Sequence, residues 1–294
     1  MLCVATLLGG RSASASAQTP HAPPLERRIC EVTRSGQLPA EARETSGLAR
    51  SALHSDRFWT HNDAGGQPEL FALDARGLLI RRVRVNGATM TDWEDVATAS
   101  CNGESCLYIA DIGDNDGDRD HIVIYRIPEP ADHAVETAAA VALRVRFPDG
   151  PRDAEALFTD SAGNLYLVNK GRREPIFLYR HPAGHADGIA TLERVRELFP
   201  QPANDLDRVT GAAASPDGRW VAIRTYRALY FYAAAELIAG DAAVQPLVAD
   251  LSAVGESQGE GVILTDDGTV WLSSEAESND AMPSLSRLRC TLPG

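Results

Sequence analysis

Apolar and polar residues recur along this chain in a repeating order that predicts β-strands. Each repeat opens with a short motif whose third residue is Ser, Thr or Glu, whose fourth is small in most copies and whose fifth is aliphatic. The clearest copy has the sequence Asp-Trp-Glu-Asp-Val and occupies residues 92–96. The copies are residues 44–48, 92–96, 153–157, 208–212 and 258–262. Each copy introduces an apolar stretch of strand length, which predicts repeats of one β-rich unit.

The residues after each motif predict further antiparallel strands. Second strands rich in β-branched and aromatic residues are expected at 58–62, 107–111, 165–169, 220–224 and 270–274. Third strands are expected at 69–73, 122–127, 175–179, 228–232 and 285–289. Fourth strands are visible in the first four repeats, for example at 79–85 and 141–147. The turns at 160–164, 215–218 and 265–268 contain Gly or Asn, which accept the positive φ of a tight reversal.

The third residue of each motif marks a regular period. These marker residues are Ser46, Glu94, Glu155, Thr210 and Glu260, spaced by 48, 61, 55 and 50 residues. Such a period, with three strands in the last repeat and four in each of the others, predicts an all-β fold, a five-bladed β-propeller. Six blades are the alternative if a degenerate blade lies in the 61-residue interval, although its alanine-rich segment 129–140 favours a loop or one helical turn. A sandwich of two sheets would explain the strands but not their period.

The N-terminal segment is expected to complete the last blade. Only 34 residues follow Glu260, and the 28 residues from Gln18 to Ser46 bring the total to 62, the length of one blade. A strand at 27–32 would then lie beside the strand at 285–289. The N-terminal strand therefore closes the ring in this prediction.

Ring closure predicts how the cysteines pair. Cys30 and Cys290 would lie on neighbouring strands, close enough for a disulfide. Cys101 and Cys106 flank a turn sequence and predict a second, local disulfide. Four reduced thiols are the alternative. No Cys or His spacing indicates a zinc site.

Composition narrows the class of protein. The 294 residues are 44% hydrophobic and carry a formal charge of −13. The negative charge argues against a nucleic-acid partner because it repels a phosphate backbone. No apolar run approaches the roughly 18 residues that a membrane helix needs. These features predict a soluble monomer without a membrane span, in which residues 27–294 form a single β-propeller domain.

The N-terminal residues predict export. Residues 2–8 are largely apolar, and the Ala-Ser-Ala sequence at 15–17 resembles the site that signal peptidase cuts. We expect residues 1–17 to be a signal peptide and residues 18–26, with three prolines, to be a flexible leader. The even number of cysteines that remain fits a periplasmic or secreted protein. A disordered tail without a targeting role is the alternative.

The propeller arrangement would bring the marker residues together at one rim. The first strand of each blade lines the central channel and the second returns antiparallel to it, so the start of one meets the end of the other. Glutamates crowded into a narrow channel repel one another unless they are protonated or share a cation. Ligands that are all oxygen favour calcium over zinc or copper. The predicted calcium ligands are Ser46, Glu94, Glu155, Thr210, Glu260 and Asp111.

Alternatives to this calcium site remain open. The marker glutamates could instead make structural hydrogen bonds to neighbouring blades. Asp92 and Asp153, which begin two of the motifs, are expected to support the ligands rather than to bind the ion. The segment 114–120 is a separate calcium candidate because its aspartates alternate, but Tyr125 occupies the twelfth position, where a calcium-binding loop has glutamate. A solvated acidic loop is the alternative for that segment.

Basic side chains are expected at the same rim. Lys170 follows the second strand of the third blade, and Arg224 ends that of the fourth. Beside a cation held by carboxylates, they would neutralise the phosphate or carboxylate group of a substrate. His61 could act as a general acid or base, or could simply pack. No serine or cysteine triad and no glycine-rich nucleotide motif is present.

These motifs resemble those of a known group of proteins. The segments that carry the resemblance are 92–95, 111–115, 153–157, 209–211, 215–218 and 258–261. They are similar to segments of secreted bacterial β-propeller proteins and, more loosely, of esterase-like phytase domains and five-bladed calcium-dependent apyrases. The likeness spans residues 40–290. Lactonase-type propellers are a poorer match, since they usually have six blades and a different ligand set.

The resemblance implies an activity. In the apyrase type, a calcium ion on the axis of the ring binds the phosphates of the substrate. By motif position, this role would fall to Ser46, Glu94, Glu155, Thr210 and Glu260.

The sequence thus predicts an exported calcium-binding propeller that hydrolyses a small phosphorylated or otherwise anionic substrate. The alternative is a binding module without catalysis, in which a structural metal supports recognition of a protein or glycan. The shape of the rim distinguishes the two hypotheses. A deep, basic-rimmed cleft over the metal favours an enzyme, whereas a flat aromatic face favours a binding module.

Overall fold

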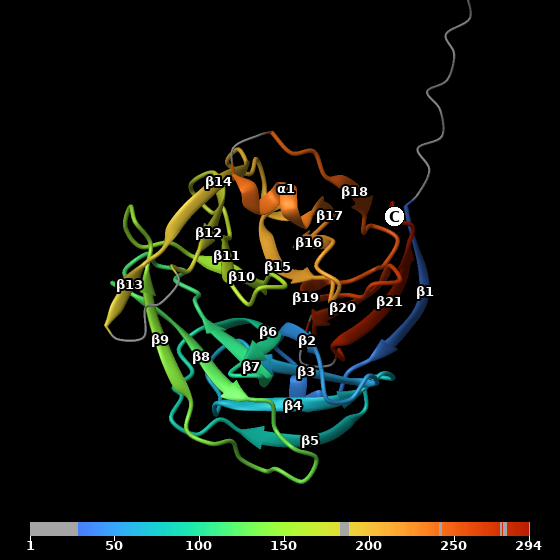
Figure 1. Ribbon diagram of the computed structural model, residues 1–294. Helices are drawn as coiled ribbons and strands as arrows, with labels where there is room; N and C mark the ends of the chain where they lie inside the picture. Colours follow the sequence, from blue (N-terminus) through green and yellow to red (C-terminus); the bar gives the residue numbers. More distant parts are fainter. Residues whose placement is uncertain (1–28, 183–187, 241–242, 277, 279–280, 294) are drawn as a thin grey trace, which may run out of the picture.

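Five short strands stand side by side around one axis, and each is the innermost strand of its own sheet (Figure 1). They are β2 (Thr45–Arg50), β6 (Trp93–Cys101), β10 (Ala154–Thr159), β15 (Val209–Ala214) and β19 (Gln258–Leu264). The chain is therefore a five-bladed β-propeller, as predicted, and not a six-bladed one. The computed structural model describes residues 29–182, 188–240, 243–276, 278 and 281–293.

The other strands of each blade follow in order from the axis outward. The second strands are β3 (Arg57–Asn62), β7 (Glu104–Asp111), β11 (Leu165–Asn169), β16 (Trp220–Thr225) and β20 (Thr269–Glu275). The third strands are β4 (Glu69–Asp74), β8 (Ile122–Pro128), β12 (Ile176–Arg180), β17 (Ala228–Ala233) and β21 (Ser284–Cys290). The fourth strands are β5 (Leu79–Arg84), β9 (Val141–Arg146), β14 (Glu193–Phe199), β18 (Leu247–Asp250) and β1 (Cys30–Gln37). The predicted second and third strands agree closely with these bounds.

A few elements depart from the regular pattern. β13 (Ile189–Thr191) pairs in parallel with β9, so the connection between β12 and β14 of the third blade adds a fifth strand to the second blade. The described residues also contain the helix α1 (Ala234–Ala239) and the 3-10 helices η1 (Ala40–Ala42) and η2 (Asp205–Asp207). These additions lie outside the inner strands and leave the axis unchanged.

The long second repeat is explained by a loop. Residues 129–140 contain no strand, as predicted, and they lie against the first blade, where Glu136 bridges to Arg84. At the start of the loop, buried Glu129 accepts hydrogen bonds from the Ser51 hydroxyl and from Trp59 Nε1 of the first blade, the latter at 2.9 Å. The extra residues therefore join two blades instead of forming a sixth.

Apolar side chains fill the space between neighbouring blades. Between the first and second blades, Trp59, Leu70 and Ile109 are fully buried. Comparable clusters occupy each of the other four junctions. Apolar burial stabilises by roughly 25 cal/mol per Å². The blades are thus held together through their faces, which leaves the axis to polar side chains.

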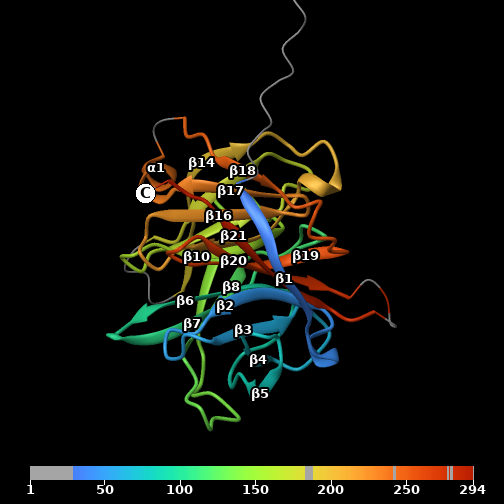
Figure 2. The same cartoon turned by 90° about the vertical axis from the view of Figure 1, so that its right-hand side faces the viewer.

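The N-terminal strand closes the ring, as predicted. β1 pairs antiparallel with β21 and forms the outer edge of the last blade (Figure 2). It starts and ends further along the chain than the expected 27–32. Cys30 lies opposite Cys290 and forms a disulfide with it. The second predicted disulfide, between Cys101 and Cys106, links the hairpin of β6 and β7.

The expected signal peptide, residues 1–17, and the leader, residues 18–26, lie outside the described residues. Their removal, and the extent of the domain at 27–294, stay predictions. Among the described residues, no helix has the length and apolar character needed to cross a membrane.

The closing disulfide is expected to matter more than the local one. Its cysteines are 260 residues apart, against 5 for the local disulfide, and a cross-link that closes a longer loop removes more entropy from the unfolded chain. We expect the double substitution Cys30→Ser with Cys290→Ser to lower the free energy of unfolding by about 2–5 kcal/mol. Denaturant unfolding without reductant measures this.

The matched control is Cys101→Ser with Cys106→Ser. It should cause a clearly smaller loss. An equal or larger loss in the control would contradict the greater contribution assigned to the closing disulfide.

Candidate functional site

Every inner strand carries a β-bulge at its marker residue. The register of each inner strand against its second strand shifts at this point in all five blades. A bulge adds an unpaired residue and re-aims its side chain, which is why bulges are frequent beside functional sites. The shifted intervals are Thr45/Leu48, Trp93/Asp95, Ala154/Ala156, Val209/Gly211 and Gly259/Val262. The sequence located the markers but not the bulges.

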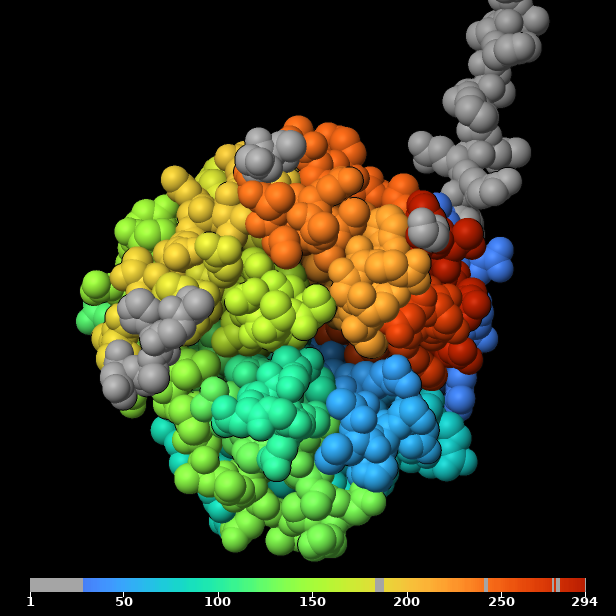
Figure 3. All heavy atoms as spheres, viewed as in Figure 1, coloured from blue at the N-terminus to red at the C-terminus, as the bar shows by residue number. Residues whose placement is uncertain are grey.

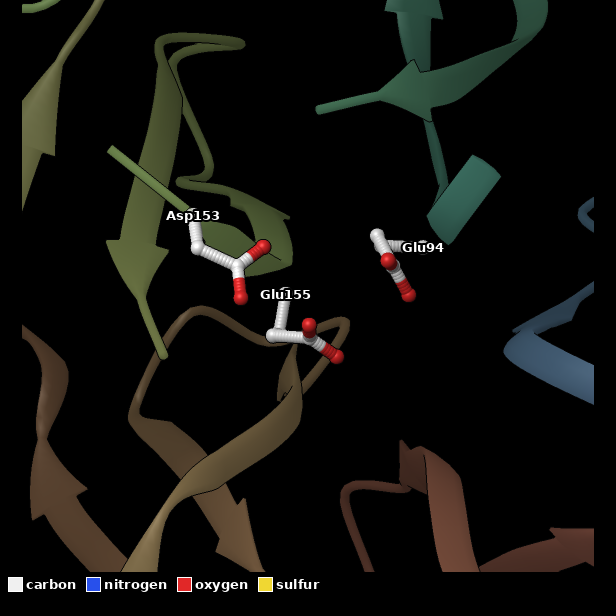
Figure 4. A group of neighbouring side chains, drawn as sticks. All are labelled: Glu94, Asp153 and Glu155. Atoms are coloured by element: carbon white, nitrogen blue, oxygen red, sulfur yellow. The ribbon is translucent and has the colours of Figure 1, made fainter. Parts of the chain in front are cut away.

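Two marker glutamates and one neighbouring aspartate converge at the axis. Glu94 of β6, Glu155 of β10 and Asp153, which precedes β10, each offer a carboxylate oxygen within 4.8 Å of the others. Figure 4 shows the three carboxylates facing a common space. All three residues are buried. A group of this kind can hold a metal ion.

A lysine shares the space with these carboxylates. Lys170 Nζ lies 2.5 Å from Glu155 Oε1. Burial lowers the pKa of the Lys170 ammonium, but Glu155 and Glu94 outweigh this effect, and the pKa lies above its usual range. Lys170 is therefore cationic at neutral pH. As predicted from its position after the second strand, it reaches the marker residues, although here it neutralises a carboxylate of the protein.

One ammonium does not balance the glutamates. Burial raises the pKa of Glu155 to about 7, with Lys170 opposing the rise and Asp153 adding to it. Burial and then Glu155 raise the pKa of Glu94 well above its usual range. Burial and Glu155 do the same for Glu260. These three glutamates thus hold their protons to a higher pH than usual.

Glu260 carries the clearest sign that a partner fits here. It is 3% exposed, and its Oε2 atom has no hydrogen-bond partner. Buried polar atoms are nearly always paired, so such an atom calls for an explanation such as an ion. The candidate ligand atoms of Glu94, Glu155 and Asp153 are carboxylate oxygens, which suits a hard cation such as calcium. The residues present therefore fit the predicted group.

The two hydroxyl markers tie blades together. The Ser46 hydroxyl donates to the backbone oxygen of Glu94 at 2.7 Å. The Thr210 hydroxyl donates to the backbone oxygen of Glu260 at 3.4 Å. Ser46 and Thr210, two of the predicted calcium ligands, thus bond to the backbone of neighbouring blades, and their role as ligands stays a prediction.

Asp111 holds the backbone beside the site. It forms an ion pair with Arg119 at 2.9 Å and accepts a hydrogen bond from the amide of Asp92 at 3.2 Å. It is not one of the three converging carboxylates. In the acidic segment 114–120, Asp114 accepts hydrogen bonds from amides of its own loop, including Gly117 at 3.1 Å. This carboxylate closes a turn and does not face a metal site.

Arg224 does not lie where a substrate could contact it. It is fully buried, and its Nη1 donates to the backbone oxygens of Gly261 at 2.6 Å and Ser273 at 2.9 Å. Its Nη2 forms an ion pair with Glu256. The predicted substrate-binding role is therefore replaced by a structural one, because the guanidinium joins the fourth and fifth blades.

His61 packs inside the first blade. It is fully buried, and its ring lies edge-on to Trp93. Burial lowers the pKa of His61 to about 4, which the backbone of Asn62 opposes only in part. The neutral ring fits the packing alternative better than the predicted acid or base role.

Three residues near the axis were not foreseen as part of the site. Asp153 was expected only to support the ligands, yet it lies among them. Burial and Glu260 raise the pKa of the Tyr226 phenol, so it stays protonated near the glutamates. Gly113 lies so close that a Cβ atom there would be 2.4 Å from both Asp92 Oδ2 and Glu94 Oε1. Only the Asp-Ile-Gly-Asp-Asn motif hinted at Gly113.

The opposite end of the channel is hollow. A cavity of about 870 Å³ opens there, at the face seen in Figure 3. Its inner wall begins two residues beyond each marker, at Leu48, Val96, Leu157, Ala212 and Val262. It contains none of the three converging carboxylates. The acidic site and the cavity are therefore separate ends of one channel.

Comparison with known proteins shows a shared fold. No protein-family model and no curated protein matches the chain. It is similar to an aldose sugar dehydrogenase from Streptomyces coelicolor (TM-score 0.54, 13% identity, 92% of this chain and 100% of that chain). It is also similar to the major allergen Mala s 1 of Malassezia sympodialis (TM-score 0.56, 10% identity, 86% and 95%). A gluconolactonase from Xanthomonas campestris gives a TM-score of 0.47, at 13% identity over 84% and 72%. The first two similarities support a β-propeller and do not single out phytases or apyrases.

The raised carboxyl pKa values predict how stability depends on pH. The unfolded chain releases these protons near pH 4.5 and the folded chain only at higher pH, so a chelator-treated protein should lose stability as pH rises. His61 acts in the opposite direction between about pH 4 and 6.5. From pH 6.5 to 8, His61 no longer contributes, and only the glutamates make stability depend on pH. Each kcal/mol lost lowers Tm by about 2–4 °C in a domain of this size, so we expect a fall of several degrees.

Thermal unfolding in EDTA measures this, with Glu94→Gln as the comparison. The variant should show a shallower fall, because one of the coupled carboxyls no longer titrates. A wild-type Tm that stays level or rises between pH 6.5 and 8 would contradict the account.

Proposed function

We propose that the acidic residues at the axis bind a calcium ion and that the protein hydrolyses a small anionic substrate there, such as a phosphate ester. The observation that carries the proposal is the convergence of Glu94, Glu155 and Asp153 at the axis. Lys170 pairs with Glu155 and Arg172 pairs with Asp153, at 3.2 Å, which leaves Glu94 without an ion pair among the described residues. A divalent cation would offset the burial and the mutual repulsion that raise the pKa values of these glutamates.

The structure suggests which residues would hold the ion. Glu94, Glu155 and Asp153 offer three carboxylates, and the unpartnered oxygen of Glu260 offers a fourth. Calcium accepts six to eight oxygens with flexible geometry, so waters or a substrate can complete the shell. Asp153 takes the place that the sequence gave to Asp111.

A bound calcium ion would polarise a phosphoryl oxygen and favour attack by water. The Lys170 ammonium lies 2.5 Å from Glu155, where it can neutralise an anionic group bound beside the carboxylates. The protonated Tyr226 phenol can donate a hydrogen bond to the same group. Burial of the carboxylates keeps bulk water from screening these interactions.

The choice of an anionic substrate depends on the ion. Without a cation, the carboxylates repel an anion, and Arg224 is engaged elsewhere. Binding of substrate should therefore require calcium. The motif resemblance to apyrases and phytases points to phosphate esters as the first class to test.

The proposal extends to location and assembly. The two disulfides favour an oxidising compartment, so we propose a periplasmic or secreted protein that acts as a monomer.

Calcium should stabilise the folded protein through these residues. An ion at 100 times its Kd adds about 2.7 kcal/mol to the free energy of unfolding. We expect calcium to raise the Tm of the wild-type protein and to raise it much less in Glu94→Gln, Glu155→Gln and Glu260→Gln. Asp118→Asn, in the exposed acidic loop, is the matched control and should respond like the wild type.

The same samples decide between the two functions. Hydrolysis of phosphate esters or lactones that depends on calcium and fails in Glu94→Gln supports the enzyme. Calcium binding with no turnover across the panel supports the binding module. A wild-type Tm that calcium does not change would contradict the metal site itself.

Gly113 offers a test that leaves every ligand in place. A Cβ atom there would collide with Asp92 and Glu94 side-chain ends, so Gly113→Ala should displace carboxylates without disturbing backbone packing. We expect weaker calcium binding by isothermal titration, by about 10- to 100-fold. Gly66→Ala is the control, because its Cβ would meet no atom closer than 3.7 Å. Equal calcium affinity in both variants would show that Glu94 is not a ligand.

A further inference from the structure

Asp95 occupies a position where the other blades have the smallest residues. The fourth motif residue is Gly47, Ala156, Gly211 and Gly261 in those blades. The inner strands approach closely there: a Cβ atom at Gly47 would be 2.4 Å from Val96 N, and one at Gly211 would be 2.7 Å from the Glu260 backbone oxygen. One blade alone places a carboxylate at this level, and Asp95 is 1% exposed.

The Asp95 carboxylate contacts three inner strands. One oxygen accepts the amide of Val96, in its own strand β6, at 2.8 Å. The other accepts the amide of Leu157 in β10 at 2.8 Å and that of Ala212 in β15 at 3.4 Å. These strands belong to three different sheets, so no backbone ladder connects them. The side chain supplies hydrogen bonds that the sheets do not.

The contacts of Asp95 lie directly beside the acidic site. Asp95 follows Glu94 in the sequence, and Leu157 lies two residues after Glu155. Holding Leu157 to β6 therefore fixes where Glu155 stands relative to Glu94. The Ser46 hydroxyl, which donates to the Glu94 backbone oxygen at 2.7 Å, restrains β6 from the other side.

We propose that Asp95 is the positioning residue of the acidic site: its carboxylate ties β10 and β15 to β6 and so sets the separation of Glu94 and Glu155. The link between the strands consists of the hydrogen bonds that Asp95 accepts from Leu157 and Ala212. The expected effect of this link on calcium affinity rests on the proposed function. Residues of this kind, which orient metal ligands without touching the ion, change metal affinity strongly when they are replaced.

The test compares two variants with a matched control. Asp95→Asn keeps the shape but offers one acceptor oxygen and turns an N–H group toward the amides. Asp95→Ala installs the residue that the third blade has at this position, and it serves if Asp95→Asn does not fold. Leu178→Ala is the control, because Leu178 is fully buried in β12, away from the axis, and its truncation lowers stability without touching the tie.

Two readouts are taken at a temperature where every variant is folded. The first is amide hydrogen exchange at Leu157 and Ala212, which should be slow in the wild type and in Leu178→Ala and fast in the Asp95 variants. The second is calcium affinity by isothermal titration, which should fall by about 10- to 100-fold in the Asp95 variants only. Unchanged exchange in the Asp95 variants would overturn the proposal.

The readouts separate this proposal from the proposed function. If the wild type binds calcium and Asp95→Asn binds it equally well, or if Leu178→Ala weakens binding as much, the positioning role is overturned while the metal site stands. If the wild type binds no calcium, the proposed metal site is wrong. Hydrogen exchange at the Leu157 and Ala212 amides then tests by itself whether Asp95 holds the strands together.

Discussion

Carboxylates of like charge lie close together where the five blades meet, and the resulting repulsion constrains the rest of the site. Burial raises the pKa of Glu94 and Glu260 well above the usual range, and Lys170 neutralises only part of the charge. A folded protein keeps such a cluster only if some function or partner offsets the desolvation of the charges. The Oε2 atom of Glu260 has no hydrogen-bond partner, and the absence of a side chain at Gly113 leaves room for the carboxylates of Asp92 and Glu94.

Polar side chains connect the inner strands around the axis, whereas apolar side chains pack between the blades. The hydrophobic clusters lie between the sheets, and the stabilisation from apolar burial has no direction of its own. The hydroxyls of Ser46 and Thr210, the Asp95 carboxylate and the Arg224 guanidinium each bond to the backbone of another blade. These directional bonds select one arrangement of the inner strands. The bulges then turn the glutamates toward the centre.

Local sequence signals predicted the fold well. Alternation, turn residues and the period of the markers located the blades, and length alone suggested that the N-terminal strand closes the ring. The sequence could not show which side chains reach the axis, because bulges and loop contacts decide that. Arg224 was expected at the rim, but Glu256 and two backbone oxygens draw it inward. Asp153 was expected behind the ligands, and the bulge at Glu155 brings both carboxylates forward.

The central claim is that these carboxylates hold a cation on the axis. The most direct measurement is anomalous diffraction from crystals grown with calcium. The account predicts a peak bonded to oxygens of Glu94, Glu155 and Asp153, with Lys170 displaced from Glu155. A map with no peak at the axis, and with Lys170 still on Glu155, would contradict it.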